Sequence, residues 1–104
     1  EEGKLRVSSL LDQALAMIRE KRAGIEQRYG IRLVGVVGSV ARGEEKAESD
    51  IDIVFDLAGG TTLFKLADAS FELEEAIGRA IDLVNREALR PNARAYIERD
   101  LVFA

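Results

Sequence analysis

Apolar residues recur at helical spacing near the start of the chain. Over residues 4–29 they fall on one face of a helix and alternate with charged residues on the other. The centre of the apolar face is formed by Leu11, Leu15, Ile18, Ile25 and Tyr29. Ser8 and Ser9 are candidate caps, and Gly30 suits the left-handed position after a helix. We therefore predict an amphipathic helix over residues 4–29 that packs on a core.

Two strand-like runs follow this helix. Ile31–Val37 is almost continuously apolar, as in a strand covered on both faces. It contains Gly35, and a glycine inside a strand often marks a close approach of another backbone. Ile51–Leu57 alternates: positions 51, 53 and 55 are apolar, whereas acidic residues 50, 52 and 56 share the other side with Val54. The charged stretch 39–49 between the runs is expected to be a connection.

The second half of the chain predicts a helix, a strand and another helix. Thr61 or Thr62 caps a helix that runs to about Arg79, a short strand covers Ala80–Val84, and Pro91 opens a helix over 92–100. The second helix has an apolar stripe of Leu63, Leu66, Ser70, Leu73 and Ile77. The apolar tail at 101–103 is expected to pack on the sheet or on a partner.

The order of these elements predicts an α/β fold. A strand, a helix and a strand in succession imply a parallel pair joined by a right-handed crossover. With 104 residues and no linker or repeat, the chain is expected to form one domain over residues 1–104.

Composition excludes several kinds of chemistry. The chain contains no Cys and no His, so disulfides, thiolate sites and imidazole catalysis are excluded. Any metal must be a hard cation held by carboxylates, which favours Mg²⁺ or Mn²⁺. A net charge of −4 argues against direct nucleic-acid binding. No apolar run approaches the length of a membrane span, and we expect a cytoplasmic protein.

Three aspartates are candidates for a metal site. Asp50 and Asp52 are spaced to lie on one side of a strand, where their charges repel unless a cation binds. Asp82 is the single charge in the strand Ala80–Val84, and in-register pairing of the two strands would place it beside Asp52. The alternative is that these carboxylates simply occupy a solvent-exposed face. Three carboxylates could hold two divalent ions, the arrangement that suits phosphoryl-type displacement.

A small-residue turn precedes the acidic motif. Gly38 and Ser39 follow the first strand directly, and such a turn lets backbone N–H groups and a hydroxyl approach phosphate oxygens. Arg42 could neutralise phosphate charge, although strand-to-loop turns often use Gly and Ser for structural reasons alone. Ser49 adds a hydroxyl immediately before Asp50.

These motifs together resemble a known family. The succession G-S-x-x-R-G from Gly38, S-D-x-D from Ser49, and a later strand aspartate, Asp82, is similar to the nucleotidyltransferase fold of the DNA polymerase β superfamily. More narrowly, it resembles the minimal nucleotidyltransferases that act as antitoxins beside HEPN-domain toxins. The resemblance implies a small mixed β-sheet with helices packed on it and the first two strands antiparallel.

The resemblance also implies roles for the motif residues. Asp50, Asp52 and Asp82 would hold two Mg²⁺ ions, and the turn at Gly38 and Ser39 would hold the triphosphate of ATP. The expected reaction is transfer of AMP to a tyrosine hydroxyl of the cognate HEPN RNase toxin, with Asp82 as a hypothetical proton acceptor.

Two other functions stay open at this stage. The chain could be a non-catalytic module that neutralises a toxin or carries a nucleotide by association. It could also be a nucleotidyltransferase that modifies a small-molecule hydroxyl or an RNA end. The intact acidic triad argues against the first alternative. The absence of a second domain and of a basic groove argues against the second.

Overall fold

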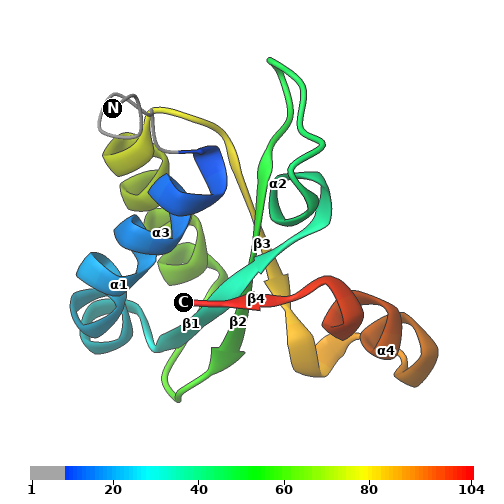
Figure 1. Cartoon of the computed structure of the whole chain (residues 1–104). Coiled ribbons are helices and arrows are strands. Elements are labelled where there is room, and N and C mark those ends of the chain that lie inside the picture. Colours follow the sequence, from blue (N-terminus) through cyan, green and yellow to red (C-terminus); the bar gives the residue numbers. More distant parts are fainter. Residues whose placement is uncertain (1–8) are drawn as a thin grey trace.

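The computed structural model describes residues 9–104. In this part of the chain four strands form one mixed sheet in the order β3-β2-β1-β4, with α1 and α3 on one face and α4 on the other (Figure 1). The expected α/β class is confirmed. In chain order the elements are α1 (Leu10–Tyr29), β1 (Ile31–Val37), α2 (Gly38–Arg42), β2 (Ile51–Leu57), α3 (Leu63–Ile77), β3 (Ile81–Asn85), the 3₁₀ turn η2 (Arg86–Ala88), α4 (Pro91–Asp100) and β4 (Val102–Phe103).

A serine cap sets the start of α1. The Ser9 hydroxyl accepts a hydrogen bond from the Asp12 backbone N–H at 3.0 Å, which satisfies one of the free donors of the first turn. Ser9 is itself extended, so α1 begins at Leu10; residues 4–8 of the predicted helix lie outside the described part of the chain. The predicted end is confirmed: Gly30 follows the helix at φ +75°.

One extra residue in β1 shifts its register against β2. Leu33 pairs with Phe55 and Gly35 pairs with Val54, so a β-bulge lies between them and the strand changes face there. After the bulge, Val37 pairs with Asp52, and neither side chain belongs to the main cluster of buried apolar residues. The two strands run antiparallel, as the family resemblance implied.

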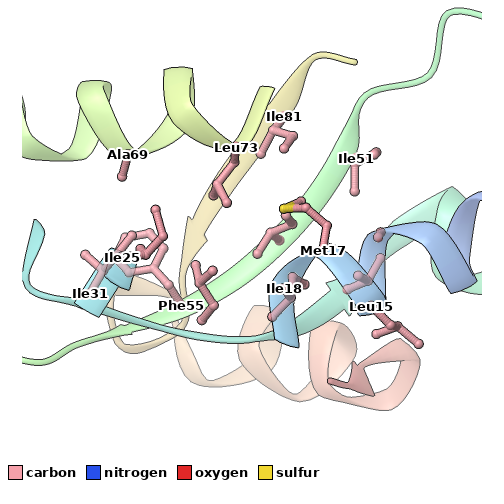
Figure 2. Packing of buried hydrophobic residues seen from close by; sticks show 14 of the residues in the cluster. Leu15, Met17, Ile18, Ile25, Ile31, Ile51, Phe55, Ala69, Leu73 and Ile81 are labelled. Carbon is pink, nitrogen blue, oxygen red and sulfur yellow. The ribbon is translucent and has the colours of Figure 1, made fainter. Parts of the chain in front are cut away.

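The core lies between the sheet and the pair α1 and α3. Figure 2 shows side chains from both helices meeting those of β1, β2 and β3. Ile18, Ile25, Ile53 and Leu73 are completely buried, and Phe55 is 2% exposed. This apolar face fixes the register of β2 because a one-residue slip would exchange its buried isoleucines for aspartates.

The boundaries of α3 differ slightly from the expected ones. Thr62 caps the helix through Lys65 N–H at 3.1 Å, as predicted, but the helix ends at Ile77 because Gly78 turns the chain at φ +72°. The predicted apolar stripe is wrong at its first position: Leu63 is 83% exposed. The helix packs on the core only farther along, through Leu66, Ala69, Leu73 and Ile77.

A parallel strand follows α3, as the strand–helix–strand order predicted. β3 begins at Ile81, one residue later than expected, and pairs with β2 in parallel. The Ala80 carbonyl still accepts a hydrogen bond from Ile51 N–H at 3.0 Å, so the residue that precedes β3 already lies alongside β2.

The C-terminal segment crosses the sheet. Because β3 and β4 form opposite edges, α4 must pass over the face that α1 and α3 leave open (Figure 1). The apolar tail then returns to the sheet as β4, antiparallel to β1, which confirms that it packs on the sheet. Gly35 permits this contact: a Cβ there would lie 2.1 Å from the Val102 carbonyl oxygen. Within residues 9–104, no helix has the length and apolar content needed to span a membrane.

We predict that Gly35→Ala destabilises the protein by about 2 kcal/mol, because its methyl group would collide with backbone rather than with a flexible side chain. Urea unfolding followed by circular dichroism measures this change. The matched control is Gly24→Ala in α1, where the nearest atoms belong to the flexible Arg28 side chain and alanine is the better helix former. Equal stability of Gly35→Ala and wild type would contradict the close approach of β4.

Candidate active site

Two aspartates from neighbouring parallel strands lie side by side. Asp52 in β2 pairs with Asp82 in β3, and both point to the open face because their neighbours Ile51, Ile53 and Ile81 point into the core. This confirms the expected in-register pairing of the two strands. Asp82 is exposed, whereas Asp52 is partly buried.

Glycine is required where β1 turns into α2. Gly38 has φ +80°, and a Cβ at this position would lie 2.4 Å from Asp52 Oδ2. The backbone conformation therefore disfavours any side chain here, and a Cβ would also displace the Asp52 carboxylate. The turn predicted at Gly38 and Ser39 thus lies directly against the acidic pair. Among the described residues, the Ser39 hydroxyl has no hydrogen-bond partner.

The acidic pair opens into a pocket of about 320 Å³. One side is formed by the end of β1, the start of α2 and the two aspartates, and the opposite side by α4. The lining residues are Val37, Gly38, Arg42, Asp52, Asp82, Leu83, Val84, Tyr96, Ile97 and Asp100. The pocket thus combines an acidic end with an apolar wall, in the size range of small-molecule sites.

Burial and repulsion raise the pKa of Asp52 above its ordinary value. Removal from water is the larger cause, and the charges of Asp82 and then Asp50 add to it, while Arg42 opposes the shift. A bound cation would relieve this repulsion.

Arg42 reaches the pocket from α2. Its guanidinium binds Glu44 Oε1 at 2.9 Å and Asp100 Oδ2 at 2.8 Å. The second contact joins α2 to the end of α4. Arg42 thus lines the pocket, but two carboxylates already share its charge.

Ser49 and Asp50 belong to the loop before β2 and do not line the pocket. The Ser49 hydroxyl accepts a hydrogen bond from Lys46 N–H at 2.8 Å, so it shapes its own loop. Arg79, a residue that the sequence motifs did not single out, donates to the Ser49 carbonyl at 3.0 Å and to the Lys46 carbonyl at 2.7 Å. It holds the loop against the end of α3. Asp50 is exposed one residue before β2.

The donor set fits a hard divalent cation. Carboxylate oxygens are the ligands Mg²⁺ prefers, and Asp52 and Asp82 present them from rigid, hydrogen-bonded strands. Within residues 9–104, however, no three acidic side chains are already gathered as metal ligands. The preformed part of the site is therefore the pair, and Asp50 contributes negative charge from the adjoining loop.

The contribution of α4 was not expected from the sequence. Tyr96, Ile97 and Asp100 line the pocket, although they come from a helix that begins only after β3 and the last motif aspartate, Asp82. The available signal was topological. A helix between a strand on one edge and a strand on the other must cross the open face of the sheet.

The profile of the nucleotidyltransferase domain family matches residues 18–104. The chain belongs to this family. The matched residues include the turn at Gly38, the acidic pair and α4.

Two relatives of this nucleotidyltransferase domain cover most of its length. It is 30% identical to the protein adenylyltransferase MntA of Thermococcus cleftensis over 89% of this chain and 94% of the relative. It is 34% identical over 71% of its length to MJ0435 of Methanocaldococcus jannaschii, provisionally named a protein adenylyltransferase, and covers 80% of that protein.

Solved structures share this fold. A provisionally assigned minimal nucleotidyltransferase matches with a TM-score of 0.67 and 33% identity, covering 85% of this chain and 93% of the other. A toxin-antitoxin structure with AMP-PNP matches with a TM-score of 0.55 at 20% identity, over 78% of this chain and 60% of the other, and shares the fold.

We predict that Asp52→Asn raises the melting temperature of the metal-free protein at pH 7 by a few degrees, because it removes a charge that folding disfavours. The sign follows from the raised pKa: folding stability falls as pH rises from the ordinary aspartate pKa through the higher folded value, and the amide escapes this loss. Thermal melts with EDTA, and then with Mg²⁺, measure both effects. Mg²⁺ should stabilise wild type more than the variant.

Asp56→Asn is the matched control on the same face of β2. Asp56 binds Arg86 through two contacts, of 3.2 and 2.6 Å, so its loss should lower the melting temperature. If Asp52→Asn lowered it as well, the acidic pair would not be a source of repulsion.

Proposed function

We propose that this nucleotidyltransferase domain is a Mg²⁺-dependent protein adenylyltransferase and an antitoxin. It transfers AMP from ATP to a tyrosine hydroxyl of a HEPN RNase toxin in the cytoplasm and so inactivates the toxin. The observation that carries the proposal is the in-register pair of Asp52 and Asp82 beside Gly38, in one pocket.

The comparisons support this choice of substrate class. A relative that covers nearly the whole chain is named a protein adenylyltransferase. Structures of the same fold come from toxin-antitoxin systems, one of them with the ATP analogue AMP-PNP. The proposal extends these properties to this chain, in which Gly38, Arg42, Asp52 and Asp82 line one pocket.

The proposed reaction is a displacement at phosphorus. The acceptor hydroxyl oxygen forms a bond to the α-phosphorus of ATP. The bond between that phosphorus and the oxygen that links it to the β-phosphorus breaks, and pyrophosphate leaves. The hydroxyl proton moves to a carboxylate, which we assign to Asp82 because it is exposed at the pocket and accessible to an acceptor.

The other proposed roles of the motif residues are to bind Mg²⁺ and the triphosphate. Asp50, Asp52 and Asp82 would hold Mg²⁺, which when bound neutralises charge on the attacking and leaving oxygens. Gly38 lets the backbone of the turn approach the triphosphate without a side chain in between. Ser39 and Arg42 follow in α2 as donors to phosphate oxygens, and Ser49 is proposed as a further donor from the loop.

The pocket by itself does not complete an acceptor site. Asp82, which lines the pocket, is exposed to solvent. A partner protein that presents its hydroxyl to this pocket would exclude water from the reacting groups. This is the structural reason for preferring a macromolecular acceptor.

We predict that the purified chain, incubated with a HEPN toxin encoded beside it, ATP and Mg²⁺, adds the mass of AMP to the toxin. Replacing Asp50 and Asp52 together by alanine should abolish the adduct, because this removes ligands for the cation. Intact-mass spectrometry provides the measurement, and a Tyr→Phe substitution at the modified toxin residue identifies the acceptor.

Other results would favour the alternatives. A tight complex without an adduct, unaffected by the double substitution, would indicate a non-catalytic binding module. AMP found on RNA or on a small molecule in the same mixture would indicate another acceptor.

We predict that Asp82→Asn lowers the transfer rate about 100-fold or more, since it removes both a cation ligand and the assigned proton acceptor. Initial rates at saturating ATP and over a range of Mg²⁺ concentrations measure this effect. Asp68→Asn is the control, because Asp68 is exposed on α3 across the sheet from the pocket. Substantial activity in Asp82→Asn would remove Asp82 from the catalytic residues.

A further inference from the structure

The wall of the pocket formed by α4 differs in character from its acidic end. Tyr96 is 62% exposed although it lines a pocket, and within residues 9–104 its hydroxyl has no hydrogen-bond partner. Ile97 lies next to it on the same wall, and Val84 lines the pocket from β3. A large aromatic surface at the mouth of a pocket gains free energy when a flat apolar group covers it.

Ion pairs, rather than a buried face, fix α4 over the site. The helix has no fully buried residue. Asp100 at its end binds Arg42 of α2 at 2.8 Å, and Glu98 lies 3.8 Å from Arg86, which itself binds Asp56 of β2. These contacts connect the helix to both β2 and α2.

We propose that α4 is the base-binding wall of the site, with Tyr96 as the residue that stacks on the nucleoside base. This inference rests on the proposed function and adds to it the residue that recognises the base. The acidic end and the turn at Gly38 receive phosphates and cation, and the aromatic wall is the remaining surface of the same pocket that suits a planar ring. Arg99, 5.1 Å from the ring centroid of Tyr96, supports the ring from its own helix.

The absence of Trp from the chain allows a direct optical test. In Tyr96→Trp the new side chain is the only indole, placed on the proposed wall. A non-hydrolysable ATP analogue with Mg²⁺ should quench or shift its fluorescence on binding. Inorganic tripolyphosphate with Mg²⁺, which has phosphates but no base, should bind without this change.

Calorimetry with the same two ligands completes the test. Tyr96→Ala should weaken binding of the ATP analogue about tenfold and leave tripolyphosphate binding unchanged, since only the first ligand carries a base. Tyr96→Phe should bind like wild type because it keeps the ring. Phe64→Ala, at a residue 84% exposed on α3, is the matched loss of an aromatic side chain elsewhere and should have no effect.

The outcomes separate this inference from the proposed function. If wild type and Tyr96→Ala bind the ATP analogue equally, the base does not stack on Tyr96 and the inference is overturned while the function stands. Equal weakening for both ligands would also overturn it, because Tyr96 would then act on the phosphates or on the position of α4. If wild type binds neither ligand in the presence of Mg²⁺, both the inference and the proposed function fail.

Discussion

Parallel pairing of β2 with β3 places the carboxylates of Asp52 and Asp82 side by side. The electrostatic repulsion between these two groups is the constraint on which the site depends. Asp52 cannot turn away, because the isoleucines on either side of it are fixed in the core. Asp82 is held opposite by the ladder of hydrogen bonds between the strands. The core thus has two roles: it stabilises the fold, and it holds like charges together at a cost that a bound cation would remove.

The two faces of the sheet are stabilised in different ways. Between the sheet and α1 and α3, apolar burial dominates, and side chains of both helices pack against those of the strands (Figure 2). On the other face, α4 lacks a buried side chain and is held by ion pairs to Arg42 and Arg86. Such contacts are weaker and more sensitive to salt than apolar packing. The rigid face therefore supports the acidic pair, and the face that can adapt surrounds the pocket.

Much of this arrangement could be predicted from the sequence because it depends on local signals. Period-two alternation in Ile51–Leu57 and a single charge in β3 were enough to predict the pairing of Asp52 with Asp82. Thr62 and Gly30 marked helix ends through their own backbone preferences. The resemblance to nucleotidyltransferases supplied the expected antiparallel arrangement of β1 and β2.

The features that were missed depend on contacts between distant residues. The Arg42–Asp100 pair joins positions 58 residues apart, and the sequence around either residue does not predict its partner. The exposure of Leu63 reflects where α3 meets the core, which its own periodicity does not encode. Arg79 appears unremarkable in the sequence because its partners are backbone carbonyls, which every residue provides.

The bulge in β1 constrains the length of this strand. A single inserted residue between Leu33 and Gly35 decides which side chains of the following segment face the core and which face the aspartates. Removing one residue there would exchange the positions of Val36 and Val37 and carry the turn at Gly38 to the wrong side of the sheet. Insertions and deletions should therefore be tolerated in the charged loop before β2 but not in this strand, where one residue of length sets the orientation of the turn at Gly38.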